Sequence, residues 1–423
     1  MAEPAQDVHA DLIYDWNRID QIRPQKRVEL DDETLRDGLQ SPSITNPAIG
    51  EKVEILHLMA ALGVDSANIG LPGAGPRVVE HVQRLAEEIV KAKLAIQPNC
   101  AARTVIADIQ PIADVSQRAG IAIEAAMFLG SSPIRRYTED WDLTRLLRAT
   151  EESVRFAVKQ GLPAMYVTED TTRTDRETVR RLYTTAIENG ARRVVVCDTC
   201  GHATPSGVRA LLTFVLGIVK ESGEDVKVDW HGHNDRGLAL TNALTAMTSG
   251  ADRVHGCALG IGERCGNTSM DQLLVNMKLL GWREADLVRL PEYVRLVSRV
   301  CRVPIPHNYP VVGPDAFETG TGVHAAAVIK AYKKNDSWLA NRVYSGVPAD
   351  EFGMDQKIVI GPMSGKSNVV WWLEKRGLKA EPAVVDRIFA AAKRSNRILT
   401  DEEILHIAED RQLVDEWSFF QVT

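Results

Sequence analysis

The stretch VDWHGHNDRG (Val228–Gly237) ends a short apolar run with two histidines placed two residues apart. In a β-strand, residues i and i+2 point to the same side of the sheet. A strand through Val228–His233 therefore directs the side chains of His231 and His233 toward one point. Polar residues and a glycine follow at once, which is typical of a strand that ends in a loop.

Seven further runs of this kind precede or follow the stretch, so that the chain has eight candidate strands. They are 27–35, 64–71, 94–102, 121–129, 163–170, 192–200, 226–234 and 252–260. Amphipathic segments of helical length lie between them, and several end in glycine. Eight β-then-α units within about 250 residues predict an α/β fold, a (β/α)8 TIM barrel. A doubly wound open sheet is the alternative, but its G-x-G-x-x-G motif follows none of the runs.

The pattern changes after residue 285, and four prolines fall within residues 304–314. Such a segment is typical of a loop or linker, and helical patterns resume beyond it. We therefore expect an N-terminal extension (1–26), the barrel (27–285), a linker or lid segment (286–320) and a mainly helical C-terminal subdomain (321–423).

The composition is that of an ordinary soluble protein, with 44% hydrophobic and 25% charged residues among 423. A net charge of −7 offers no general basic surface for nucleic acid or for an anionic membrane. The first residues lack the apolar segment of a signal peptide, and six cysteines are too few for a disulfide framework. We expect a cytoplasmic protein that binds neither nucleic acid nor a membrane.

Catalytic groups of a TIM barrel collect at the carboxyl ends of its strands. Here the first strand runs into Arg36-Asp37, the fifth ends at Glu169 and the seventh at the histidine pair. Two imidazoles and a carboxylate predict a divalent metal site, with Mg²⁺, Mn²⁺, Fe²⁺ or Zn²⁺ as candidates. The alternative is a buried histidine pair that is hydrogen-bonded and has no ligand.

Three motifs in this order, LDDETLRDGLQ (30–40), HGHND (231–235) and GIGERCGN (260–267), carry a family resemblance. They resemble the metal-dependent barrel family of 2-isopropylmalate, homocitrate and citramalate synthases, which also holds 3-hydroxy-3-methylglutaryl-CoA lyase and 4-hydroxy-2-oxovalerate aldolases. TGVHAAAVIK (321–330) and IGPMSGKSN (360–368) resemble the C-terminal subdomains of the synthases.

The resemblance implies roles for individual residues. The implied metal ligands are Asp37, His231, His233 and Asn267, with Mg²⁺ or Mn²⁺ as the expected ion and Zn²⁺ as the alternative. The implied catalytic residues are Arg36, Glu169 and His324. The residues expected to bind substrate are Gln40, Thr199, Arg135 and Asn68. Tyr344 and Lys366 receive no assigned role.

The resemblance also implies a reaction, the Claisen-type condensation of acetyl-CoA with a 2-oxo acid followed by thioester hydrolysis. The loop GIGERCGN favours a synthase over a lyase, because Cys265 does not stand where the lyases carry their catalytic cysteine. Asn68 replaces the usual carboxylate, and Arg135 with Arg136 favours a second carboxylate on the substrate, although both arginines suit a surface or a CoA contact equally. Carbon–carbon bond cleavage by a lyase or aldolase and an inactive metal-binding partner subunit remain alternatives. The synthases imply a homodimer.

Overall fold

Eight parallel strands close into one barrel in the computed structural model, which describes residue 9 and residues 11–409. The strands are β1 (Glu29–Asp32), β2 (Ser66–Asn68), β3 (Gln97–Arg103), β4 (Glu124–Gly130), β5 (Ala164–Glu169), β6 (Arg193–Asp198), β7 (Lys227–Gly232) and β8 (Arg253–Gly256). They pair in sequence order, and β1 closes on β8 with Asp31 opposite His255. The predicted TIM barrel is confirmed, and the open sheet is excluded.

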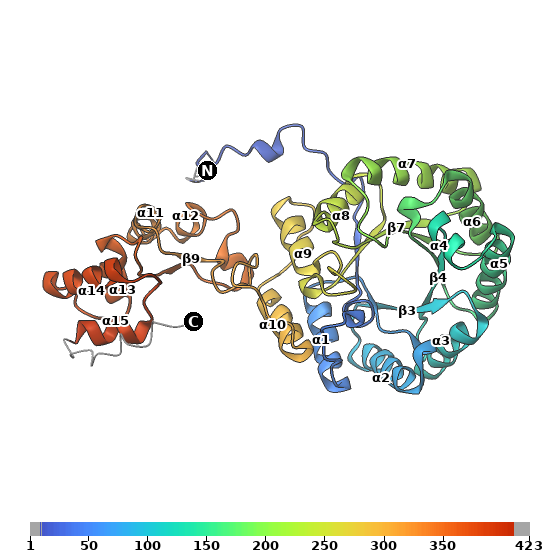
Figure 1. Cartoon of the computed structure of the whole chain (residues 1–423), viewed down its shortest axis with the longest axis horizontal. Helices are drawn as coiled ribbons and strands as arrows, with labels where there is room; N and C mark the ends of the chain where they lie inside the picture. The colour runs from blue at the N-terminus through green and yellow to red at the C-terminus, as the bar shows by residue number, and fades with distance from the viewer. Residues whose placement is uncertain (1–8, 10, 410–423) are drawn as a thin grey trace, which may run out of the picture. The chain divides into compact units, whose positions relative to one another are not determined.

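Helices surround the barrel on its outer side, and one short helix after β4 lies at an end of the barrel (Figure 1). They are α1 (Ile49–Ala61), α2 (Pro76–Ala92), α3 (Ile106–Ala119), α4 (Pro133–Thr138), α5 (Leu143–Lys159), α6 (Arg176–Glu188), α7 (Pro205–Ser222), α8 (Ala239–Thr248), α9 (Met270–Leu279) and α10 (Leu290–Cys301). Local chemistry sets several of their ends. The side chain of Asp175, for example, accepts a hydrogen bond of 2.9 Å from the backbone amide of Thr178 and caps α6.

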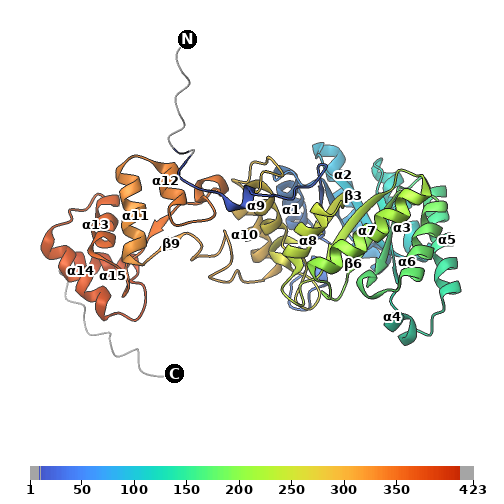
Figure 2. The same cartoon turned by 90° about the horizontal axis from the view of Figure 1, so that it is seen from above.

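The alternation of side chains along β7 separates the outer core from the barrel interior. Trp230 is fully buried and lies on the face opposite to Asp229 and His231. All eight strands run the same way, so their carboxyl ends meet at one mouth of the barrel. Helix α4 follows the carboxyl end of β4 and projects at one end of the barrel (Figure 2).

A buried layer of paired charges fills the barrel below this mouth. Asp229 accepts hydrogen bonds from Arg193 (2.6 Å) and Arg253 (2.7 Å), and Arg253 also donates to Glu124 (3.0 Å). Burial raises the pKa of the Asp229 carboxyl, but the positive charges of Arg253 and Arg193 outweigh burial and hold that pKa well below its usual range. This ionised, hydrogen-bonded layer therefore closes the barrel beneath the mouth.

The chain divides into two compact units between residues 305 and 306, later than the predicted boundary at 285. The difference arises because α10 belongs to the barrel. It packs against α1, and the Tyr293 hydroxyl donates to Asp32 and lies 3.2 Å from the Thr34 hydroxyl. The described residues through Trp16 group with the second unit, not with the barrel.

The second unit contains five α-helices and a two-stranded parallel sheet within the described residues. These are α11 (Gly322–Lys333), α12 (Ser337–Arg342), α13 (Lys366–Lys375), α14 (Pro382–Arg394), α15 (Asp401–Ala408), β9 (Glu318–Thr319) and β10 (Lys357–Ile358). Its core packs Trp372 against Ile388 and Ile404. His9 joins this unit through a 2.8 Å hydrogen bond to Asp336. Across both units, no described helix is long and apolar enough to cross a membrane.

Candidate metal centre and active site

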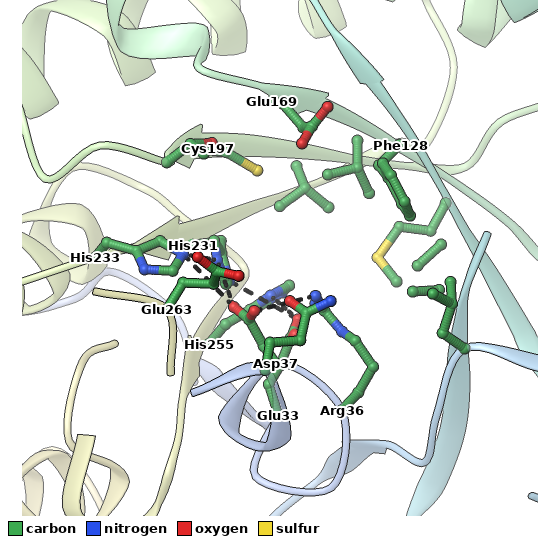
Figure 3. Close-up of a pocket in the computed structure, with 18 of the residues that line it drawn as sticks. Glu33, Arg36, Asp37, Phe128, Glu169, Cys197, His231, His233, His255 and Glu263 are labelled. Carbon is green, nitrogen blue, oxygen red and sulfur yellow. Dashed lines mark hydrogen bonds and ion pairs between the residues drawn. The ribbon is translucent and has the colours of Figure 1, made fainter. Parts of the chain in front are cut away.

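Three side chains from two strand ends converge at the mouth of the barrel (Figure 3). Strand β7 directs His231 and His233 to the same side, and the turn that follows β1 brings Asp37 beside them. Oδ2 of Asp37 lies 3.3 Å from Nε2 of His231 and 3.6 Å from Nε2 of His233, and the two nitrogens are 3.3 Å apart. Ligand atoms that share one cation at about 2.1 Å stand at about this spacing from one another.

The protonation states of these three side chains suit the binding of a cation. Burial lowers the pKa of His231, and burial together with the neighbouring His231 lowers the pKa of His233 to about 4. Burial raises the pKa of Asp37, but the charge of Arg36 and the contact with His231 outweigh it and hold that pKa well below its usual range. Neutral imidazoles and an ionised carboxylate are the forms that coordinate metal ions.

Asn267, in the loop after β8, lies next to this cluster. Its backbone pairs with that of His233, and its side-chain amide donates to the carbonyl of Ile261 at 3.1 Å. Its Oδ1 is buried and has no hydrogen-bond partner among the described residues, and the same holds for Oδ2 of Asp37. Buried acceptors of this kind need a partner, and a divalent cation would supply one. Asp37, His231 and His233 therefore fit a divalent metal, and Oδ1 of Asn267 is a further buried oxygen without a partner among the described residues.

A second group of buried side chains, Glu33 and His255, lies directly behind the histidine pair. Nδ1 of His255 is 2.9 Å from Oε1 of Glu33, and its Nε2 is 3.1 Å from Asp229 in the charged layer. The rings of His255 and His231 are 5.6 Å apart in an edge contact. Glu33 also binds Arg36 and lies 3.8 Å from Nδ1 of His231. Neither residue is among the site residues that the sequence predicts, although a histidine inside the apolar run of β8 is a usable signal.

A cavity of about 360 Å³ opens beside Asp37, His231 and His233. Arg36, Gln40, Glu169 and Thr199 line it together with Asp37, His231 and His233. Burial, with the nearby charge of Asp170, raises the pKa of Glu169 above its usual value although Arg135 opposes this shift. A partly buried carboxylate with a raised pKa is suited to proton transfer.

Two residues expected to bind substrate lie elsewhere. Asn68 is fully buried below the cavity, and with its amide oriented to satisfy both groups it accepts a 3.2 Å hydrogen bond from Nε of Arg36. Arg135 is on α4, where it pairs with Glu139 at 3.0 Å. It lines a separate depression that shares Glu169 and Thr199 with the cavity. Asn68 thus contacts Arg36 instead of facing the cavity.

His324 belongs to the second unit, in the first turn of α11. Its exposed ring stacks on the ring of Tyr344, with centroids 4.2 Å apart and planes inclined by 27°. Tyr344 is 50% exposed, so the pair presents a flat polar-aromatic surface to solvent within its unit.

Comparison with known sequences identifies close relatives. A sequence model of the HMGL-like family matches residues 27–297. A probable 2-isopropylmalate synthase of Methanopyrus kandleri is 33% identical over 370 residues, which cover 87% of this chain and 69% of that protein. Homocitrate synthase AksA of the same organism is 32% identical over 386 residues, covering 90% and 91%. A homocitrate synthase of Saccharolobus solfataricus is 30% identical over 389 residues, covering 91% and 80%.

Comparison with solved structures finds the same barrel in more distant proteins. The HMG-CoA lyase of Bacillus subtilis has a TM-score of 0.56 at 20% identity and covers 67% of this chain and 97% of its own. An HMG-CoA lyase of Acinetobacter baumannii, in complex with coenzyme A and 3-methylmalate, has a TM-score of 0.54 at 19% identity and covers 64% and 90%. At these identities the likeness shows a shared fold.

Proposed function

The chain belongs to the HMGL-like family, and from that premise we propose that it condenses acetyl-CoA with a 2-oxo acid and then hydrolyses the thioester. The observation that carries this proposal is the buried cluster of Asp37, His231 and His233, which faces a cavity that Arg36 and Glu169 also line. Such a site can bind a 2-oxo acid at a metal and transfer one proton beside it.

Asp37, His231, His233 and Asn267 would hold the metal, for which we propose Mg²⁺ or Mn²⁺. When bound, a divalent metal supplies Lewis acidity to the keto group of a 2-oxo acid. The guanidinium of Arg36 would donate hydrogen bonds to the keto oxygen as negative charge develops there. Its orientation is held by Glu33, Asp37 and Asn68, so little rearrangement is needed during the reaction. Gln40 and Thr199 would orient the substrate from the cavity wall.

The proton that leaves the acetyl methyl group would pass to Glu169, either directly or through His324. The methyl carbon then forms a bond with the keto carbon, and the keto oxygen gains a proton and becomes a tertiary hydroxyl. Water replaces CoA at the thioester carbonyl and leaves a carboxylate, free CoA and a proton. The raised pKa of Glu169 favours its role as the proton acceptor near neutral pH.

A synthase is favoured over a lyase by the thiols near the cavity. Cys265 in the loop after β8 is exposed, whereas its neighbours Glu263 and Arg264 line the cavity. Cys197 does line the cavity, but burial raises the pKa of its thiol well above the usual value. That thiol is neutral and lies among apolar side chains, so we assign it a packing role.

The test is to follow free CoA thiol in a mixture of protein, acetyl-CoA and a panel of 2-oxo acids. The protein is stripped by a chelator and then reloaded with Mg²⁺ or Mn²⁺. We expect release that requires both the metal and a 2-oxo acid, and that falls at least about 100-fold in His231→Ala. No release with any acid contradicts the proposal, and cleavage of 3-hydroxy-3-methylglutaryl-CoA instead would establish the lyase alternative.

A further inference from the structure

The cavity has two chemically different sides. Figure 3 shows Asp37, His231 and His233 on one side, with Phe128 across the cavity and Glu169 near it. Six apolar lining residues lie on β3, β4 and β5 or directly after β2, and we call them the apolar wall: Leu71, Ala101, Ala126, Phe128, Met165 and Val167.

The barrel backbone builds most of this wall. Ala126 and Phe128 are two residues apart on β4, and Met165 and Val167 are two apart on β5, so each pair faces the interior. The strand register places Ala126 beside Met165 and Phe128 beside Val167. Strands β1, β7 and β8 and the loops that follow them carry most of the polar groups of the cavity, whereas β3, β4 and β5 carry five of the six wall residues. Glu169 ends β5 on the same face as Met165 and Val167. Five of the six wall residues are therefore held by barrel strands, and Leu71 belongs to the loop after β2.

The charged side chains that line the cavity either lie away from the apolar wall or are negative. They would therefore not attract a second carboxylate of the substrate to the wall. The carboxylates that line the cavity are Glu33, Asp37, Glu169 and Glu263. The two arginines among the described lining residues are already paired. Arg36 binds Glu33 and Asp37, and Arg264 donates to Asp235 at 2.8 Å and to the carbonyl of Thr199.

A second carboxylate placed against the wall would lose its hydration without gaining a cation, and Glu169 would repel it. Arg135 acts on Glu169, but it lines the adjoining depression and its charge is already paired there with Glu139. Arg136 bonds the hydroxyl of Thr178 at 3.2 Å. The two arginines that suggest a dicarboxylic substrate in the sequence thus lie outside the wall.

We infer that the 2-oxo acid of this enzyme carries an apolar side chain and no second carboxylate. The inference rests on the proposed function and names the substrate class of that site. The 2-oxo carboxylate group would lie at the metal ligands and the side chain against the apolar wall. Ala101 and Ala126 leave room for a branched or extended chain, and each added methylene that stays within the wall is expected to improve kcat/KM by about fourfold.

The test compares kcat/KM for CoA release across two groups of 2-oxo acids at saturating acetyl-CoA. The apolar group is 2-oxobutyrate, 2-oxoisovalerate and 4-methyl-2-oxovalerate, and the dicarboxylic group is oxaloacetate and 2-oxoglutarate. We expect the best apolar acid to exceed both dicarboxylates by at least about 100-fold. A dicarboxylate that equals or exceeds it overturns the inference while leaving the condensation intact.

If no acid in either group releases CoA, the proposed function fails, and direct binding then tests the wall on its own. Calorimetric titration of the Mn²⁺-loaded protein with 2-oxoisovalerate and with 2-oxoglutarate is expected to show tighter binding of the apolar acid. Equal or tighter binding of 2-oxoglutarate would overturn the inference by this independent measurement.

Phe128 allows a matched pair of variants, because its side chain is only half-buried and faces the cavity. Phe128→Arg adds a cation to the wall, and we expect the ratio of kcat/KM values for 2-oxoisovalerate and 2-oxoglutarate to fall by at least about tenfold. Phe128→Leu keeps the wall apolar and should preserve the ratio. A folded Phe128→Arg protein with an unchanged ratio argues against the wall as the specificity element. If this variant does not fold, the comparison of apolar and dicarboxylic 2-oxo acids with the wild-type protein still tests the inference.

Discussion

At His231 and His233, burial lowers the pKa of both imidazoles, so each ring is neutral near pH 7 and offers a nitrogen lone pair. A neighbouring buried histidine helps to hold this orientation. His255 is held between Glu33 and Asp229, and its ring contacts that of His231. Residues that do not bind a metal themselves commonly orient its ligands through contacts of this kind.

Replacing Glu33 tests this support at the residue scale. Glu33→Gln removes the charge that holds both His255 and Arg36, and we expect Mn²⁺ affinity to fall about 10- to 100-fold. Calorimetric titration of the stripped protein with Mn²⁺ measures the change without relying on activity. Glu263→Gln is the matched control, because it also removes a carboxylate that lines the cavity. Equal losses in both variants would mean that Glu33 acts only through the total charge of the site.

The loop after β8 acts at the scale of an element, because its backbone brings Asn267 beside β7. Gly262 in this loop has φ +152°, and a Cβ atom there would lie 2.2 Å from Nδ2 of Asn267. Glycine is therefore required twice over, by the backbone angle and by the close approach of the amide. The motif GIGERCGN encodes this geometry locally, which explains why it is recognisable in the sequence.

Gly262→Ala should displace Asn267 and weaken Mn²⁺ binding by roughly tenfold. Gly237→Ala is the control, since Gly237 also has a positive φ of +70° but a Cβ there meets no atom within 4 Å. Both variants should lose about 1 kcal/mol or more of unfolding free energy through backbone strain, measured by urea denaturation. Only Gly262→Ala should lose metal affinity, and an equal loss in Gly237→Ala would contradict this account.

The two units of the whole molecule carry different parts of the proposed machinery. The metal ligands and Glu169 belong to the barrel, and His324 belongs to the second unit. The resemblance to the synthases implies a homodimer in which the second unit of one copy serves the other copy. We propose the same assembly for this chain.

Mixing two inactive variants tests the assembly. His231→Ala lacks a metal ligand, and His324→Ala lacks the proposed proton-transfer group, so we expect each alone to lose most CoA release. If His324 acts in the partner, random re-pairing in an equal mixture should restore about a quarter of the wild-type activity. The mixture must first be dissociated and reassembled, and size-exclusion chromatography with light scattering checks for dimers. If mixed dimers form but activity is not restored, His324 acts within its own chain or not at all.

The sequence by itself determined the barrel and much of the candidate site. Periodic apolar runs define strands, and the carboxyl ends of parallel strands meet at one mouth whatever the details of packing. The alternation of side chains then suffices to bring His231 and His233 together, and the motif after β1 adds Asp37 to them. All of these are properties of short segments, so they can be recognised in the amino-acid sequence of one chain.

Only the tertiary structure decided what surrounds those ligands. The pairing of Glu33 with His255 depends on the closure of β1 on β8, which joins residues 222 positions apart. The register between β4 and β5 sets Phe128 beside Val167 in the apolar wall, and the position of α4 leaves Arg135 outside the cavity. The division after residue 305 depends on α10 packing against α1. Each of these features follows from contacts between distant segments, which local propensity and residue spacing do not specify.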